Sequence, residues 1–187
     1  SNRTVGHSTV DHGLPLTFWR SVGHSYTAFA VESMMDELAH QAHMDPLTFR
    51  LINTEDKPRM HAVLKRAQEA MQAMSVPEGH YLGVAAHSSF MTDVAQIAEV
   101  SVEQGEIRVH RVTCVADVGT AVNPDIVRAQ LEGAVMFALT ATLYGKIDLE
   151  GGRVTQSNFH DYPILRMDRA PAVEVILMDS QEDPTGI

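Results

Sequence analysis

The stretch that decides the fold is AEVSVEQGEIRVHRVTCVADV, residues 98–118. Apolar and polar residues alternate in its first part, as in a β-strand with one face toward a core. The apolar set is Ala98, Val100 and Val102, and the polar set is Glu99, Ser101 and Glu103. Gln104 and Gly105 then supply a turn, so we expect a β-hairpin. In the second strand the apolar phase changes between Val109 and Val112, which predicts a bulge near His110 and Arg111.

The segment after the hairpin carries the signals of a helix start. Asn123 is a capping residue, Pro124 suits the first helical position, and Asp125 adds an early carboxylate. We expect a helix over residues 123–143. Beyond Glu132 it is apolar on all sides, which predicts a helix buried in the core. Its uncharged part, residues 133–145, is too short to cross a bilayer.

The segment before the hairpin has helical spacing. We expect helices over about 26–43 and 58–74, with a short one between them that is capped by Asp45 and opened by Pro46. The first helix has one apolar face, made of Ala28, Val31, Met35, Leu38, Ala39 and Ala42. Three successive helices predict a helical layer.

The last part of the chain returns to strands. A short hairpin is expected around EGG, residues 150–152, and a final strand in PAVEVILMDS, residues 171–180. Both faces of that strand are apolar, which is typical of a strand inside a sheet. The element order predicts an α+β fold in which a helical layer packs on a mixed or antiparallel sheet with one buried helix. We expect one unit over residues 1–187, mainly helical over 1–75 and β-rich over 76–187.

Composition excludes some classes of partner. The 187 residues are 44% hydrophobic, enough for a core, and the formal net charge is −10. Because Lys and Arg do not cluster, we expect no nucleic-acid partner and no membrane surface. The one cysteine, Cys114, lies in a predicted strand and is expected to be an inert buried thiol. The first residues lack a signal-peptide pattern, and the compartment, cytoplasmic or periplasmic, stays undetermined.

One candidate metal site is on the first helix. Asp36, His40 and His43 are spaced by four and three residues, so their side chains share a face. The alternative is a solvated polar face opposite the apolar one.

A second candidate is the turn and helix start in ADVGTAVNPDIVRAQLEG, residues 116–133. Free backbone N–H groups and the positive end of a helix favour an anion there. Gln130 adds a donor and an acceptor, and Gly133 permits close approach of a ligand. The alternative is a well-capped core helix.

A third candidate is the loop around Phe18, Trp19 and Arg20, just before the first helix. Aromatic rings with one cation are a plausible wall for a flat aromatic or carboxylated substrate. A hydrophobic staple onto the helix would use the same residues.

Three stretches together resemble one family. They are FWRSVGHS with AFAVESMMDELA and DPLTFRL (residues 18–51), VAQIAEVSVEQGEIRVHRVTCVADVGTAVNPDIVRAQLEG (94–133) and GRVTQSNFHDYPILRM (152–167). The chain resembles the molybdenum-cofactor-binding large subunit of the xanthine dehydrogenase and aldehyde oxidase family, in particular the isoquinoline 1-oxidoreductase beta-subunit type. The likeness implies that it is a C-terminal part of a longer subunit.

The resemblance also implies a reaction. Such enzymes oxidise an aldehyde or an N-heterocycle with water as the oxygen source. The cofactor would be molybdopterin, in bacteria the cytosine dinucleotide form, and electrons would pass to a small [2Fe-2S] partner subunit. By position, Gly119, Thr120, Asn123, Gln130 and Gly133 would bind the cofactor, and Phe18, Trp19 and Arg20 would line the substrate pocket.

Two departures from the family pattern concern the substrate loop and the general base. The loop reads Arg20-Ser21-Val22-Gly23, where the wider family has Arg-Gly-Phe-Gly. The base is a glutamate in a Gly-x-Gly-Glu run, and the chain reaches only Gly186-Ile187. We therefore expect the glutamate just after Ile187, and expect the chain by itself to bind no cofactor and to be inactive. A scaffold module of the same fold without a cofactor is the alternative.

Overall fold

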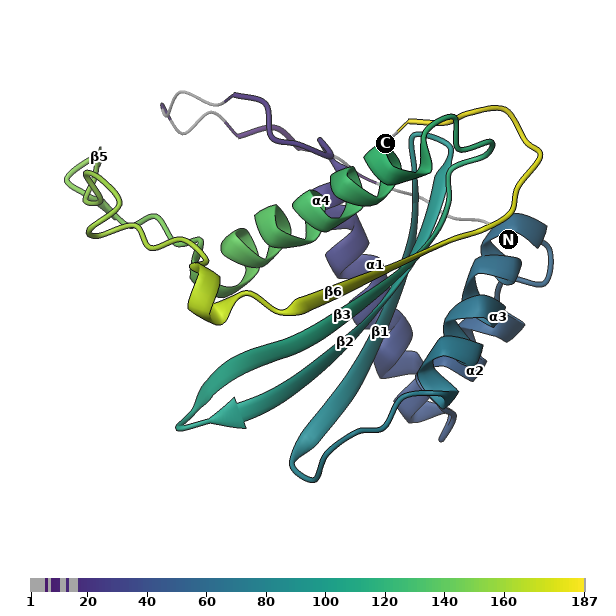
Figure 1. The fold of residues 1–187 in the computed structure, drawn as a ribbon. Helices are drawn as coiled ribbons and strands as arrows, with labels where there is room; N and C mark the ends of the chain where they lie inside the picture. Colours follow the sequence, from purple (N-terminus) through teal and green to yellow (C-terminus); the bar gives the residue numbers. More distant parts are fainter. Residues whose placement is uncertain (1–5, 7, 11–12, 14–16, 187) are drawn as a thin grey trace.

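The predicted hairpin is the centre of a four-stranded sheet. The computed structural model describes residues 6, 8–10, 13 and 17–186 (Figure 1). Strands β1 (His80–Ser89), β2 (Thr92–Glu103) and β3 (Glu106–Asp117) are antiparallel, and β6 (Ala172–Leu177) pairs with β3 in parallel. The strand order is β1-β2-β3-β6, so the expected mixed sheet is confirmed.

The predicted bulge is confirmed at His110. Arg111 pairs with Glu99 and Val109 pairs with Val100, which leaves His110 as the extra residue of β3. Its ring stacks on that of His80, with 4.1 Å between centroids. His80 and Arg111 both donate to the buried carboxylate of Glu99, and mainly the His80 hydrogen bond lowers the pKa of that carboxyl.

Within the described residues, four helices cover the sheet from two sides. They are α1 (His24–Gln41), α2 (Pro46–Ile52), α3 (Pro58–Gln72) and α4 (Pro124–Tyr144). Helices α2 and α3 lie on one side of the sheet and α4 crosses the other (Figure 1). The core under α2 and α3 includes Leu47, Val63, Leu64, Ala67, Ala95, Ile97 and Val115. The α+β prediction is therefore confirmed.

The two predicted helix starts with caps are confirmed. The side chain of Asp45 accepts a hydrogen bond from Thr48 N, and that of Asn123 from Ile126 N. The later part of the chain is less regular. It holds the two-residue strands β4 (Leu149–Glu150) and β5 (Arg153–Val154) and a short 3₁₀ helix, Met167–Arg169. The β4–β5 hairpin projects away from the sheet (Figure 1).

Helix α4 is buried on one face only, which corrects the expectation of a helix enclosed on all sides. Val127, Leu131 and Val135 are its buried residues, and they pack on the apolar face of β3. Phe137 on its other side is 37% exposed. By length and composition α4 is the one helix in the described part of the chain that would suffice to cross a bilayer, a test that core helices also meet. The apolar residues beyond Glu132 therefore divide between a face that packs on the sheet and a face that is partly exposed.

Strand β6 lies at the edge of the sheet, which corrects its expected place inside it. Its apolar residues are nonetheless shared between both layers. Val173, Val175 and Leu177 pack toward α4, and Ile176 packs against the core under α2 and α3. Coverage of both faces, rather than a central position, explains the continuous apolar run.

Helix α1 is attached by polar contacts more than by its apolar face. Ala39 is its one buried residue, whereas Val31 and Leu38 of the predicted apolar face are exposed. The fully buried guanidinium of Arg50 on α2 takes the place of that packing. It donates to Glu32 at 2.8 Å and to Asp36 at 2.7 Å, both on α1. This buried pair fixes α1 beside α2.

Replacing Arg50 tests this attachment. Arg50→Met leaves the largely buried Glu32 carboxylate without its cation, so we expect a loss of about 3–5 kcal/mol in the free energy of unfolding. Urea denaturation followed by circular dichroism measures it. The control is Arg66→Met, which breaks an exposed pair with Glu69 and is expected to cost less than about 1 kcal/mol. Equal losses in the two variants would contradict a structural role for the buried pair.

Candidate functional site

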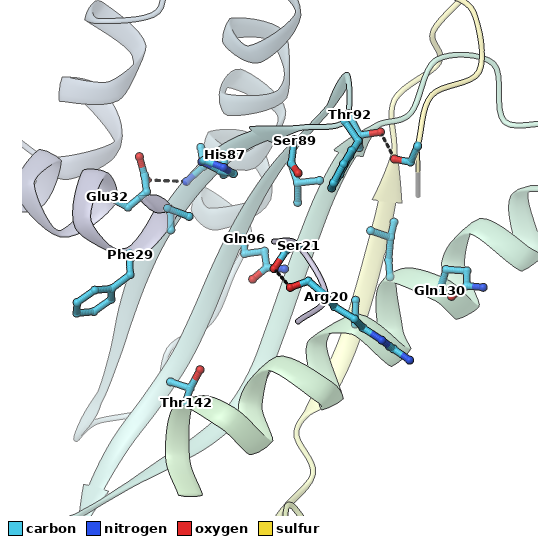
Figure 2. A pocket seen from close by; sticks show the side chains of 18 of the residues that line it. Arg20, Ser21, Phe29, Glu32, His87, Ser89, Thr92, Gln96, Gln130 and Thr142 are labelled. Carbon is cyan, nitrogen blue, oxygen red and sulfur yellow. Dashed lines mark hydrogen bonds between the residues drawn. The ribbon is translucent and has the colours of Figure 1, made fainter. Parts of the chain in front are cut away.

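A cavity of about 880 Å³ lies over β1 and β2, between α1 and α4. Helix α4 covers β3 and β6, and α1 lies along β1, so neither helix covers the middle of this face. Figure 2 shows Phe29 and Glu32 on one side, Gln130 and Thr142 on the α4 side, and Gln96 between them. The cavity thus forms because α1 and α4 lie apart on this face of the sheet.

The floor of the cavity is made by alternate residues of two strands. Ala85, His87 and Ser89 come from β1, opposite Gln96, Val94 and Thr92 of β2. Gln96 is an exposed polar side chain between Val94 and Ala98 in the same row of β2. On its other side is Cys114 of β3, whose Sγ lies 4.0 Å from Gln96 Nε2. Burial raises the pKa of Cys114 to about 11, so the thiol stays protonated at neutral pH.

The α1 wall carries two carboxylates, and both are engaged. Glu32 Oε2 accepts from Ala86 N of β1 at 2.7 Å as well as from Arg50, which joins α1 to the cavity floor. Asp36 pairs with the same Arg50. Across the residues that the structure describes, no group of three His, Cys, Asp or Glu side chains is placed to hold a metal. The candidate metal site of Asp36, His40 and His43 is therefore wrong, because an ion pair within the chain uses its carboxylate.

The α4 wall receives the predicted substrate loop. Trp19 packs against Phe137 of α4, with ring centroids 5.1 Å apart, and the Arg20 guanidinium carbon lies 4.5 Å from the same ring centre. Arg20 also lines the cavity, whereas Phe18 is 94% exposed. The loop thus runs from α4 to the start of α1, and one of its three predicted residues faces the cavity.

Two histidines face each other where that loop joins α1. His24 Nδ1 lies 2.8 Å from Nε2 of His87 on β1, and the His24 ring also packs edge-on against Phe90. Phe90 and Met91 form the two-residue turn between β1 and β2, with φ of 50° and 66°. Both angles are left-handed, a conformation that favours Gly or Asn in such turns. Phe90 of the strained turn and His87 of the histidine pair line the same cavity.

The turn before α4 does not offer the expected free amides. Gly119 N donates to the Asp117 carboxylate, and Thr120 N donates to the carbonyl oxygen of Glu182. Mainly its hydrogen bond with Arg59 of α3 lowers the pKa of Asp117. The prediction that these N–H groups are free to bind an anion is therefore wrong. Asn123 caps α4, and Gly133 lies on its exposed side, where an added methyl would meet nothing within 4 Å.

The segment from Glu182 to Gly186 is what occupies that turn. Thr120 Oγ1 also donates to Glu182 O, and Thr185 N donates to Val118 O. At Gly119 (φ 67°) a Cβ would lie 2.0 Å from Asp183 O, so only glycine permits this approach. Gly186 then reaches the strained β1–β2 turn, where its N–H donates to Phe90 O and its carbonyl accepts from Thr92 Oγ1. Gly186 lines the cavity, so the segment is fastened along its path to the cavity edge.

The structure brings together some predicted site residues and adds others. Arg20 and Gln130 line the cavity; Gly119, Thr120, Asn123, Gly133 and Phe18 do not. Sequence reasoning placed His24 in the loop before the first helix but missed His87, Glu32 and Gln96, which line the cavity. Gln96 had a local signal, a polar residue in phase with Val94, Ala98 and Val100. The histidine pair had none, because 63 residues separate its members.

The chain is similar to several known proteins. A model of the molybdopterin cofactor-binding domain matches residues 21–171. The isoquinoline 1-oxidoreductase subunit beta of Brevundimonas diminuta is 32% identical over 96% of the chain, and the membrane-bound aldehyde dehydrogenase [pyrroloquinoline-quinone] of Gluconacetobacter polyoxogenes is 28% identical over 90%. The chain spans 24% and 25% of those two proteins, about a quarter of each. The crystal structure of quinoline 2-oxidoreductase from Pseudomonas putida 86 aligns over 48% of the chain and 12% of that protein, with 26% identity and a TM-score of 0.42.

Gly119→Ala tests the docking of the segment at 182–186. The added methyl cannot coexist with Asp183 O, so we expect the segment to detach, with a cost of about 2–3 kcal/mol for strain and lost hydrogen bonds. Hydrogen exchange at the amides of Thr120 and Thr185 measures the detachment. Gly105→Ala is the control, because Gly105 has φ of 87° but no atom within 4 Å of an added Cβ. Unchanged protection of both amides in Gly119→Ala would contradict the docking.

Proposed function

The chain belongs to the family of molybdopterin cofactor-binding domains, and from that premise we propose that its cavity is part of the cofactor and substrate site of a molybdenum hydroxylase large subunit. The observation that carries the proposal is the convergence of Arg20, Gln130 and Gly186 on one cavity, from three segments distant in the sequence. The relatives with oxidoreductase names support the reaction class.

The lining suits part of a flat, hydrogen-bonding cofactor that carries phosphate. Gln96 and Gln130 offer amide donors and acceptors, and the cation of Arg20 adds positive charge at the α4 wall. Phe29 and Phe90 provide apolar walls. Both lining carboxylates, Glu32 and Asp36, have Arg50 as a counter-ion, which limits their repulsion of an anion. The chemistry of the side chains thus fits a molybdopterin.

Residues of the chain would then have distinct tasks. The bound cofactor supplies two-electron oxidation with water as the source of oxygen. Gln130 would hold the cofactor through its amide, and Arg20 would orient the substrate from the α4 wall. Gly133 leaves room for close approach on the open side of α4. Trp19 would place Arg20 through its contact with Phe137.

The tasks of Gly119, Thr120 and Asn123 are structural in this proposal. Gly119 and Thr120 hold the segment at 182–186, and Asn123 caps the helix that carries Gln130. The general base is expected to be a glutamate shortly after Ile187. The place of Gly186 at the cavity edge supports this, because the following residues would start within reach of the cavity.

The natural enzyme would have further components. We propose molybdopterin cytosine dinucleotide as the form of the cofactor, a small [2Fe-2S] subunit as electron acceptor, and an aldehyde or an N-heterocycle as substrate. The chain at residues 1–187 would be inactive by itself, since it lacks the expected base. Dye-linked oxidation of isoquinoline or benzaldehyde by the isolated chain would contradict that expectation.

A substitution at Gln130 tests the proposed site. In the full-length large subunit with its small partner, Gln130→Leu should reduce molybdenum and pterin content about ten-fold, since the loss of one hydrogen bond to the cofactor worth about 1.4 kcal/mol has that effect. Metal analysis and fluorescence of the oxidised pterin measure the content. Glu132→Gln is the control, because Glu132 lies on the same helix outside the cavity lining. Full cofactor content in Gln130→Leu would contradict the assignment of Gln130, and a full-length wild type free of molybdenum would favour the scaffold alternative.

A further inference from the structure

Two left-handed residues separate Trp19 and Arg20 from α1. Ser21 has φ of 62° and Val22 has φ of 49°. This conformation is unfavourable for a β-branched residue, so the turn keeps it only while its surroundings hold it. Val22 N donates to Trp19 O at 3.2 Å, and His24 N donates to Ser21 O at 2.8 Å. The turn is therefore hydrogen-bonded to the first residue of α1.

The turn is held at two ends. At one end Trp19 and Arg20 pack on Phe137 of α4. At the other end His24 shares a hydrogen bond with His87 of β1, across 63 residues of sequence. Together these contacts connect α4 to the sheet over the cavity. Loss of either one would let the strained turn relax.

We propose that the His24–His87 hydrogen bond is a pH-sensitive latch that holds the turn at residues 19–22 across the cavity. The bond needs a hydrogen on one of the two facing nitrogens and a free lone pair on the other. The hydrogen bond survives the addition of one proton to the pair, because a charged ring can donate to a neutral one. Once both rings are charged, both facing nitrogens carry hydrogen and two positive rings stand 5.0 Å apart. The latch then opens.

The surroundings of the pair set the direction of the pH effect. Burial lowers the pKa of His87, the charge of His24 lowers it further, and the Glu32 carboxylate on α1 raises it by a smaller amount. Glu32 is paired with Arg50 of α2 and bonded to Ala86 N of β1. The other neighbours are neutral: Phe90 of the β1–β2 turn packs against His24, and Val94 of β2 pairs with His87. Because the folded-state pKa lies below the unfolded-state value, the latch is closed at neutral pH and weakens as pH falls below about 6.5.

Trp19 reports the state of the turn, because it is the one tryptophan of the chain and packs on Phe137. We expect acrylamide quenching of its fluorescence to increase, with a red shift of emission, as the pH is lowered from 8 to 5. Far-ultraviolet circular dichroism at both pH values separates release of the turn from global unfolding. This readout is independent of the proposed function, since it needs neither cofactor nor turnover.

Three variants distinguish the latch from other titrating groups. His87→Gln keeps a side chain that can bond His24 but does not titrate, so quenching at pH 5 should stay at its pH 8 value. His87→Ala should raise quenching at both pH values. His160→Gln, which replaces a largely exposed histidine on the projecting loop, should leave the wild-type transition unchanged. A wild type without a transition, a transition retained in His87→Gln, or one abolished by His160→Gln would overturn the proposal.

Discussion

The buried guanidinium of Arg50 is the interaction on which the arrangement of the cavity depends. Helix α1 buries one residue, Ala39, and so has little apolar packing of its own to hold it. Arg50 instead binds Glu32 and Asp36, and Glu32 in turn accepts from the backbone of β1. One charge network thus ties α1 to α2 and to the sheet. Because α1 forms one wall of the cavity, the network also determines the shape of that wall.

The cavity exists because the two helices on one face of the sheet stay apart. Helix α4 follows β3 and β6, α1 follows β1, and the strip of β1 and β2 between them remains open. Two strained turns, at Ser21–Val22 and at Phe90–Met91, border this opening, and the segment ending at Gly186 is fastened to the second of them. Strain concentrated at the edge of a cavity is characteristic of functional sites. The two strained turns therefore belong both to the fold and to the edge of the proposed site.

Local sequence signals predicted most of the fold. The alternation of apolar and polar residues predicted the β2–β3 hairpin. The change of apolar phase also predicted the bulge at His110, because such a change requires an extra residue in one strand. The capping residues Asp45 and Asn123 predicted where α2 and α4 begin. Burial was harder to predict, because an apolar face does not show which surface covers it: Val31 and Leu38 are exposed, and β6 lies at an edge.

The candidate site was predicted less completely than the fold, for a related reason. Arg20 and Gln130 were identified from loop and helix context and do line the cavity. The amides of Gly119 and Thr120 were expected to be free, but carbonyl and carboxylate groups of the chain itself occupy them. Contacts such as His24–His87 and Thr120–Glu182 join residues more than sixty positions apart, and no local pattern encodes them.

The most direct measurement for the cavity as a cofactor site is anomalous X-ray scattering at the molybdenum edge from crystals of the full-length large subunit. A molybdopterin bound as proposed predicts one strong anomalous peak within the cavity bounded by Arg20, Gln130 and Gly186. A peak elsewhere in the subunit, with protein side chains filling this cavity, would contradict it.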